Sequence, residues 1–332
     1  MFFVLGLCIL LAALLVLNSA ASLVVSLLWK MFGGRITRWS GYRSAQTLFL
    51  LRTLPIALGI GAVLFLFAPA YLRHEPRVGH EDVSVKLAIF AAFSTICIAV
   101  AIVRAIATWR STTRLTAEWL RNAEPIQIPT INIPTYQVEH SFPLIAVVGA
   151  FRQRLFIARQ VFQSLTPAEL TAALEHEIGH ILAHDNLKRA VVRACRDLVL
   201  VPGGRALDRA WLEASEAAAD EFAARRGRRI GLDLASALVK IARMIPPGAR
   251  PTMTAGAFLA SEEGALGFMA RVRHLVYLAD NQQEQGTTAG LIAQLTKLIP
   301  VALTLLLVAL TSQIQILPAI HAVIERAVYI LD

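Results

Sequence analysis

The sequence TPAELTAALEHEIGHILAHD, residues 166–185, decides how the rest of the chain is interpreted. It predicts a helix, because Thr166 is a capping residue, Pro167 suits the first helical turn and Glu169 completes a capping box. Apolar residues then recur at positions 170, 174, 178 and 181, a spacing that places them on one helical face. We therefore expect an amphipathic helix with one buried side.

The same helix carries the pattern HExxH at residues 176–180. His176 and His180 lie one turn apart, so both imidazoles point the same way and can bind one zinc ion at about 2.0–2.1 Å. Glu177 projects roughly a quarter-turn away, where it would reach a metal-bound water and act as a general base. The motif predicts a zinc hydrolase that still needs a third ligand.

Glu216 is the candidate third ligand, within the sequence WLEASEAAADEFAA of residues 211–224. Asp220 follows one turn later and can accept a hydrogen bond from a ligand imidazole. The surrounding alanines have little bulk, so this helix can approach the HExxH helix closely enough for both to contact one ion. An ordinary alanine-rich amphipathic helix is the alternative interpretation. We expect His184 to support the site or lie at the surface, and Asp185 to stabilise the helix end or a nearby arginine.

The composition indicates a membrane protein. Hydrophobic residues make up 56% of the 332 residues, and the mean hydropathy is positive. Four apolar runs are candidate spans, at about residues 1–28, 53–72, 87–106 and 298–317. No positively charged region precedes the first run, so we interpret it as a retained span. The three isolated cysteines predict neither a disulfide framework nor a cysteine metal site.

The distribution of basic residues predicts the orientation. Arginines that flank the spans explain most of the net charge of +9, and no basic–aromatic module indicates a nucleic-acid partner. The loop after the first span and the segment after the third are basic, whereas the loop between the second and third is neutral. We therefore expect the N-terminus outside the cell membrane and the HExxH domain in the cytoplasm. Arg52 and Arg104 are interpreted as residues that extend to the lipid interface.

We expect three parts: a membrane region with three spans at residues 1–123, a cytoplasmic zinc peptidase domain at 124–287, and a fourth span with a short tail at 288–332. The predicted fold class is a mainly α integral membrane protein with an α+β zincin-like peptidase domain. The predicted elements of the domain are an extended, proline-containing linker at 125–136, strands at 141–148 and 155–158, and helices at about 187–200, 232–244 and 268–278. A short amphipathic helix is expected at 321–332.

These motifs together resemble the membrane-embedded gluzincin metallopeptidases. The similarity runs through the strand-like sequences, LTPAEL at residues 165–170, HEIGH, and the helix with Glu216 and Asp220. It is greatest to the BlaR/MecR-type antirepressor peptidases, in which three spans precede a cytoplasmic zinc domain and one follows; the heat-shock membrane proteases and CAAX prenyl endopeptidases are neighbours. The resemblance implies one zinc ion per chain bound by His176, His180 and Glu216, with Glu177 as the general base and Asp220 as a supporting residue.

The resemblance also implies an arginine beyond the third ligand. Arg271 is similar to an arginine that these families place after a loop, and it could stabilise the oxyanion of the transition state. His274 is its rival for that role. The His-Pro pair that precedes this arginine in the heat-shock branch is absent here.

The predicted function is an integral-membrane zinc endopeptidase. Its neighbours are membrane lipids, and its substrates are peptides or proteins, with a regulator or a misfolded membrane protein as candidates. A substrate could add a strand beside Phe142, Leu144, Ile145 and Ala146 if their strand is a free edge. The alternative is a membrane signal transducer or scaffold with a gated or structural zinc site, which cleaves only itself or one regulator.

Overall fold

A computed structural model describes residues 1–76, 83–129, 131–198, 204–245, 265–280 and 316–331. Three long helical segments carry the apolar runs, and each is long and apolar enough to cross a membrane. They are α1 (Phe2–Ile36), the continuous segment Gly41–His74 and α4 (Val85–Arg121). Each extends beyond the expected span, because arginines and polar residues continue the helix past the apolar run. The fourth expected span, 298–317, lies outside the described residues except for its last two.

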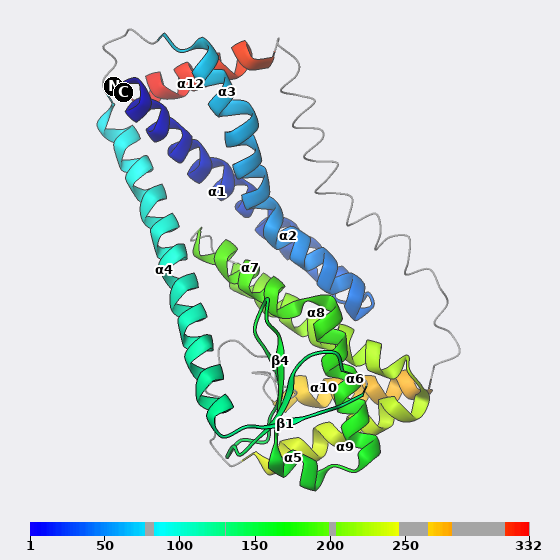
Figure 1. The fold of residues 1–332 in the computed structure, drawn as a ribbon. Coiled ribbons are helices and arrows are strands. Elements are labelled where there is room, and N and C mark those ends of the chain that lie inside the picture. Colours follow the sequence, from blue (N-terminus) through cyan, green and yellow to red (C-terminus); the bar gives the residue numbers. More distant parts are fainter. Residues whose placement is uncertain (77–82, 130, 199–203, 246–264, 281–315, 332) are drawn as a thin grey trace.

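The segment Gly41–His74 is not uniform. It consists of α2 (Gly41–Ala62), the π-helical turn η1 (Val63–Phe67) and α3 (Ala68–His74). The wider π turn ends just before Pro69, which cannot donate a backbone hydrogen bond to the preceding turn. The final helix α12 (Ile316–Leu331) packs against α3, so both chain termini lie at the end of the bundle farthest from the sheet (Figure 1).

A small mixed sheet follows α4. Its strands are β1 (Glu124–Ile126), β2 (Thr135–Val138), β3 (Ile145–Val148) and β4 (Arg154–Ala158). Their order is β1-β2-β4-β3, in which β2 and β4 are parallel and the other two pairs are antiparallel. The segment 125–136, expected to be an extended linker, contains most of β1 and the start of β2, which pair with each other despite the prolines.

Helices complete the domain. They are α5 (Arg159–Ser164), α6 (Pro167–Ala183), α7 (Asp185–Asp197), α8 (Gly204–Ala224), α9 (Arg228–Met244) and α10 (Ala265–Asp280). The sheet packs against α6, α8 and α9 in one hydrophobic core, in which Phe156, Ala172 and Leu238 are almost fully buried. This core fixes α6 against β3.

A second core joins the membrane helices to the domain. Val25 of α1 and Leu48 of α2 pack with Leu207 and Trp211 of α8. The close approach begins at Gly41, where an added Cβ would lie 2.5 Å from the backbone nitrogen of Ala218. The Gly41 amide also donates to Glu221 of α8 at 2.6 Å.

Arg52 differs from the expectation that it extends to the lipid interface, whereas the side chain of Arg104 is 62% exposed, and both arginines form ion pairs with helices of the domain. Arg52 of α2 is 7% exposed and its Nε donates to Asp208 of α8 at 2.7 Å. Arg104 of α4 donates to Asp197 of α7 at 2.7 Å. Each arginine therefore connects a membrane helix to a helix of the domain.

Candidate metal centre

The caps of α6 fix the helix that carries HExxH. Thr166 accepts from the Glu169 amide, and the Glu169 carboxylate accepts from the Thr166 amide at 2.8 Å. The same carboxylate accepts from Lys240 and Ser236 of α9, each at 2.7 Å. Burial acts to raise the pKa of Glu169, but these hydrogen bonds outweigh it and lower the pKa to about 2. Glu169 thus joins the start of α6 to α9.

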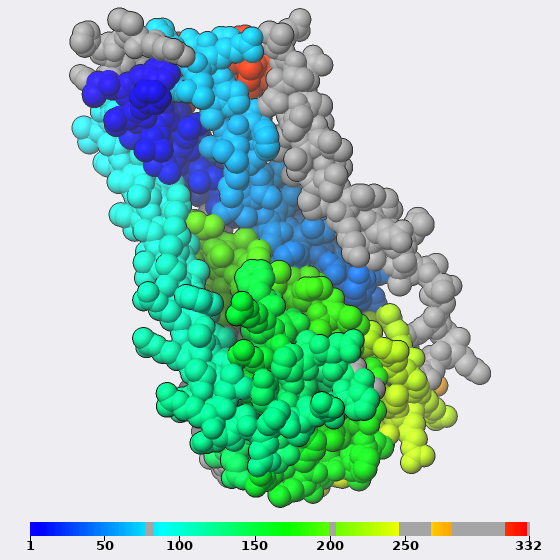
Figure 2. All heavy atoms as spheres, in the orientation of Figure 1, coloured from blue at the N-terminus to red at the C-terminus, as the bar shows by residue number. Residues whose placement is uncertain are grey.

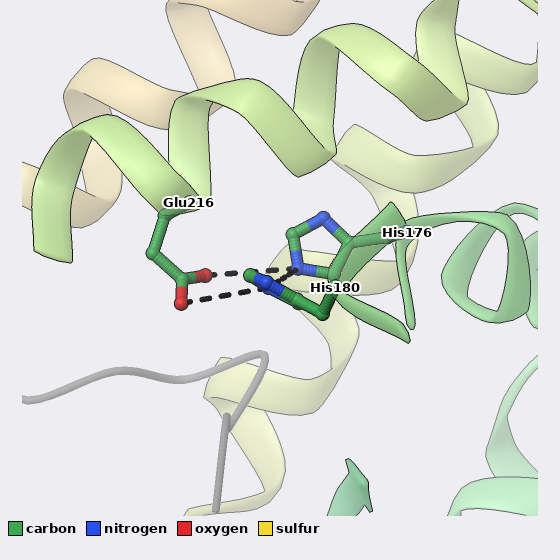
Figure 3. Close-up of side chains that lie close together, drawn as sticks. All are labelled: His176, His180 and Glu216. Atoms are coloured by element: carbon green, nitrogen blue, oxygen red, sulfur yellow. Dashed lines mark hydrogen bonds and ion pairs between the residues drawn. The ribbon is translucent and has the colours of Figure 1, made fainter. Parts of the chain in front are cut away.

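Three side chains converge at the middle of α6 and α8. His176 Nε2 lies 3.1 Å from His180 Nε2, and each lies 3.6 Å from an oxygen of Glu216 (Figure 3). All three residues are buried, with exposed fractions of 0%, 3% and 1%. Among the described residues this is the group of histidine, cysteine and acidic side chains that could hold a metal ion.

Small residues bring α8 close to α6. Gly179 faces Ala219, where an added Cβ would lie 3.2 Å from the Ala219 Cα. That separation is tighter than ordinary van der Waals contact, so any larger residue would push the two helices apart. The approach places Glu216 of α8 opposite the two imidazoles of α6.

The outer nitrogen of each imidazole faces a buried carboxylate. His176 Nδ1 lies 2.9 Å from Asp220, and His180 Nδ1 lies 2.7 Å from Asp185. Carboxylates in these positions fix the tautomer that leaves both Nε2 atoms facing Glu216. The contact of Asp185 differs from the expected role at the helix end.

The position of Asp185 depends on a left-handed residue. His184 ends α6 with φ of 56°, and α7 begins directly after it. This sharp change of direction turns Asp185 back toward His180. A left-handed histidine is uncommon, and the sequence offers no glycine there to indicate it. The exposed side chain of His184 contacts the Leu182 carbonyl and lies apart from the ligand group.

Arg271 of α10 holds the acids of α8. Its Nε and Nη2 donate to the two oxygens of Asp220 at 2.9 and 2.8 Å, and its Nη1 lies 3.2 Å from Glu216. Burial alone would raise the pKa values of both acids. The charges of Arg271 and the histidines outweigh it and hold both pKa values well below the ordinary range.

The roles expected for Arg271 and His274 in oxyanion stabilisation stay predictions, and the structure adds their contacts. The Arg271 guanidinium is 7% exposed and directed at the two carboxylates, an arrangement that suits positioning rather than oxyanion stabilisation. His274 lies one turn further along α10, where its Nε2 is 3.8 Å from Glu221 and away from the ligand group.

Glu177 is fully buried beside the three candidate ligands. Burial raises the pKa of its carboxyl to about 7, although the neighbouring histidines and the Val147 amide of β3 act in the opposite direction. Apart from the Val147 amide, no donor among the described residues faces the carboxylate oxygens. A carboxyl in this environment is suited to accept and return a proton.

The buried groups fit a zinc ion. Among the described residues neither oxygen of Glu216 has a hydrogen-bond partner, and Arg271, 3.2 Å away, also faces Asp220, so the buried oxygens that face the two imidazoles are suited to a cation. Tetrahedral zinc with bonds of about 2.0–2.1 Å separates its ligand atoms by about 3.3 Å. The observed separations of 3.1 and 3.6 Å bracket that value.

Comparison with known proteins gives the family. The profile of peptidase family M48 matches residues 109–278, just over half of the 332 residues. The chain belongs to peptidase family M48. A search of curated proteins gave no match.

Membership of family M48 confirms the prediction of a metal-dependent protease, and the family is zinc-dependent. The three apolar helices agree with a membrane protein. The match covers α5 to α9 and the sheet, together with the last part of α4 and most of α10. It does not distinguish the BlaR/MecR type from the heat-shock and CAAX types, so that choice stays a prediction.

Proposed function

We propose that this M48 peptidase is an integral-membrane zinc endopeptidase that hydrolyses peptide bonds of protein substrates at the cytoplasmic membrane face. The observation that carries the proposal is the buried triangle of His176, His180 and Glu216 with Glu177 beside it. Zinc bound there would polarise the scissile carbonyl and lower the pKa of water to about 7. Glu177 would take the proton from the attacking water and return it to the leaving amine.

The edge of the sheet supports the proposed substrate position. β3 pairs only with β4 among the described strands, and its neighbour Leu144 accepts from Ala158 of β4. The backbone N–H and C=O groups of successive residues point to opposite sides of a strand. Because those of Leu144 point toward β4, those of Ile145 and Val147 point away from it. The Val147 carbonyl accepts from Asn186, which leaves Ile145 as the position where a substrate strand would pair once this edge, where Ile145 is 1% exposed, is uncovered.

Only part of the predicted substrate strand lies in β3. Ile145 and Ala146 belong to it, whereas Phe142 and Leu144 precede it. The side chains of all four residues are buried, so they shape the strand rather than contact a substrate. A substrate would therefore be recognised through backbone hydrogen bonds, which give little sequence preference.

The proposed topology follows the basic residues. The turn between α1 and α2 and the end of α4 lie at the domain end of the bundle, and both are arginine-rich. We propose that residues 124–287 form the peptidase unit in the cytoplasm, with the N-terminus outside. Labelling of single cysteines at positions 38 and 74 in intact cells tests this, because only the second should react with an impermeant reagent.

The decisive experiment compares wild type with Glu177→Gln in the purified full-length protein. The variant should keep stoichiometric zinc and lose cleavage of an unfolded protein substrate. Unchanged cleavage would reject the mechanism. Glu216→Ala should lose zinc, and zinc that survives this change would remove Glu216 as a ligand.

The burial of the site favours the second candidate, a dedicated signal transducer with a gated site. His176 and Glu177 are both 0% exposed, so a substrate needs an opening motion to reach them. Incubation of the zinc-loaded protein with a generic unfolded substrate separates the two functions. Broad cleavage favours a general endopeptidase, and inertness toward that substrate with cleavage of one partner or of the chain itself favours the switch.

A further inference from the structure

A large cleft lies between α4, α7 and the turn that joins β3 to β4, apart from the candidate metal centre. Its volume is about 1120 Å³, and small residues of α4, such as Ala101 and Ala105, leave room on one side. In Figure 2 this region is the boundary between the cyan helix and the green domain. The proposed peptidase mechanism uses none of its charged side chains.

The cleft is strongly basic. Six arginines line it: Arg104, Arg152, Arg154, Arg189, Arg193 and Arg196. Asp197 is the one acidic residue of the lining, and it already contacts Arg104 at 2.7 Å and Arg196 at 3.5 Å. Among the described residues neither Arg152 nor Arg154 forms an ion pair with an acid. The charge of the cleft therefore favours an anionic ligand.

The position of Arg104 along α4 places one end of the cleft at the expected membrane boundary. Arg104 follows the first residue of α4, Val85, by nineteen positions, a rise of about 28 Å along the helix. A hydrocarbon core of about 30 Å that begins near Val85 would end close to Arg104. Arg104, at one end of the cleft, would thus lie at the level of lipid headgroups.

Exposed aromatic and apolar residues border the cleft. Trp109 is 67% exposed and Phe151, in the β3–β4 turn, is 87% exposed, and both belong to its lining. On α4, Ile102 and Val103 are also exposed to the surroundings of the helix. Aromatic residues beside basic ones are typical of a protein surface in contact with the headgroup region.

We propose that this cleft binds the headgroup of an anionic phospholipid, with Arg152 and Arg154 contacting its phosphate. The apolar residues of α4 would lie along its acyl chains. A lipid fits better than a soluble anion, because the arginines and the exposed side chains of Trp109 and Phe151 line the same cavity, and exposed apolar residues of α4 lie next to it.

The test measures binding by native mass spectrometry of the full-length protein in detergent. Titration with phosphatidylglycerol should give a bound species at concentrations at which phosphatidylcholine gives none. One arginine near an anionic surface contributes about fivefold in affinity, so Arg152→Ala/Arg154→Ala should weaken binding by about 25-fold. The control Arg205→Ala/Arg209→Ala removes the same charge from exposed positions on α8 and should bind normally.

Three results would overturn the proposal. If phosphatidylcholine binds equally well, the cleft does not recognise an anionic headgroup. If the control variant weakens binding as much, the effect comes from the net charge of the protein and not from Arg152 and Arg154. Full displacement of the lipid by millimolar inorganic phosphate or by an acidic peptide would assign the cleft to a soluble ligand. Because the assay reads binding and not proteolysis, its result is independent of the peptidase mechanism.

Discussion

The carboxylates behind the two imidazoles should control zinc affinity unequally. Among the described residues the Asp185 carboxylate contacts His180, at 2.7 Å, whereas Asp220 lies 2.9 Å from His176 and also accepts from Arg271 at 2.8 and 2.9 Å. Asp185→Asn therefore removes one charged contact. Asp220→Asn removes the charge from two contacts and leaves the buried Arg271 with weaker partners.

The expected magnitudes follow from these contacts. Loss of a carboxylate behind a metal ligand costs about 10–100-fold in metal affinity. We place Asp185→Asn near tenfold and Asp220→Asn near 100-fold, equivalent to about 1.4 and 2.7 kcal/mol of binding free energy. The main prediction is the order: Asp220→Asn should lose more zinc affinity than Asp185→Asn.

Competition with a zinc chelator of known affinity measures this order in the full-length protein in detergent. Circular dichroism of each variant checks that the helices are intact. Glu213→Gln is the matched control, because Glu213 is an exposed acid on the same helix as Asp220. Wild-type affinity in Asp220→Asn, or a larger loss in Asp185→Asn, would refute the reasoning.

Three further changes test the packing. Gly41→Ala places a methyl group 2.5 Å from a backbone nitrogen of α8 and should lower the free energy of unfolding by about 1–3 kcal/mol. The control Gly34→Ala, with open space around it, should not lower it. Equal melting temperatures of the two variants would contradict the close approach. Arg52→Met should cost about 3 kcal/mol of stability, and Arg52→Met/Asp208→Leu should recover most of it if burial of an unpaired charge is the cause. The pKa of Glu169 is lowered from 4.5 to about 2, so its contribution to the free energy of unfolding is complete above pH 4.5 and declines as the pH falls toward 2. The difference in melting temperature between wild type and Glu169→Gln should therefore shrink as the pH falls over that range.

Sequence patterns predict the local features of this molecule well. The capping box, the face of α6 and the one-turn spacing of His176 and His180 all depend on residues within one helix. The sequence predicts Glu216 as the third ligand because Asp220 follows it by one turn and the alanines around it allow a close approach, and the structure brings it to the imidazoles.

Features that depend on distant contacts were beyond the sequence. Arg52 and Asp208 are 156 positions apart, so nothing local distinguishes a buried ion pair from an interface arginine. The contact of Asp185 requires the left-handed turn at His184. Strand β1 could not be predicted from the sequence, because Pro125 is typical of a linker and only the pairing with β2 identifies the segment as a strand.

The packing of α8 has a consequence for the enzyme as a whole. One side of this helix presents Glu216 and Asp220 to the histidines, and another is covered by α1 and α2 around Trp211. A fragment released from its two N-terminal helices would expose that indole to water and free the backbone that carries Glu216, the proposed zinc ligand. Helices α1 and α2 therefore also hold α8 in the position that brings Glu216 to the histidines, and proteolytic activity should depend on their presence.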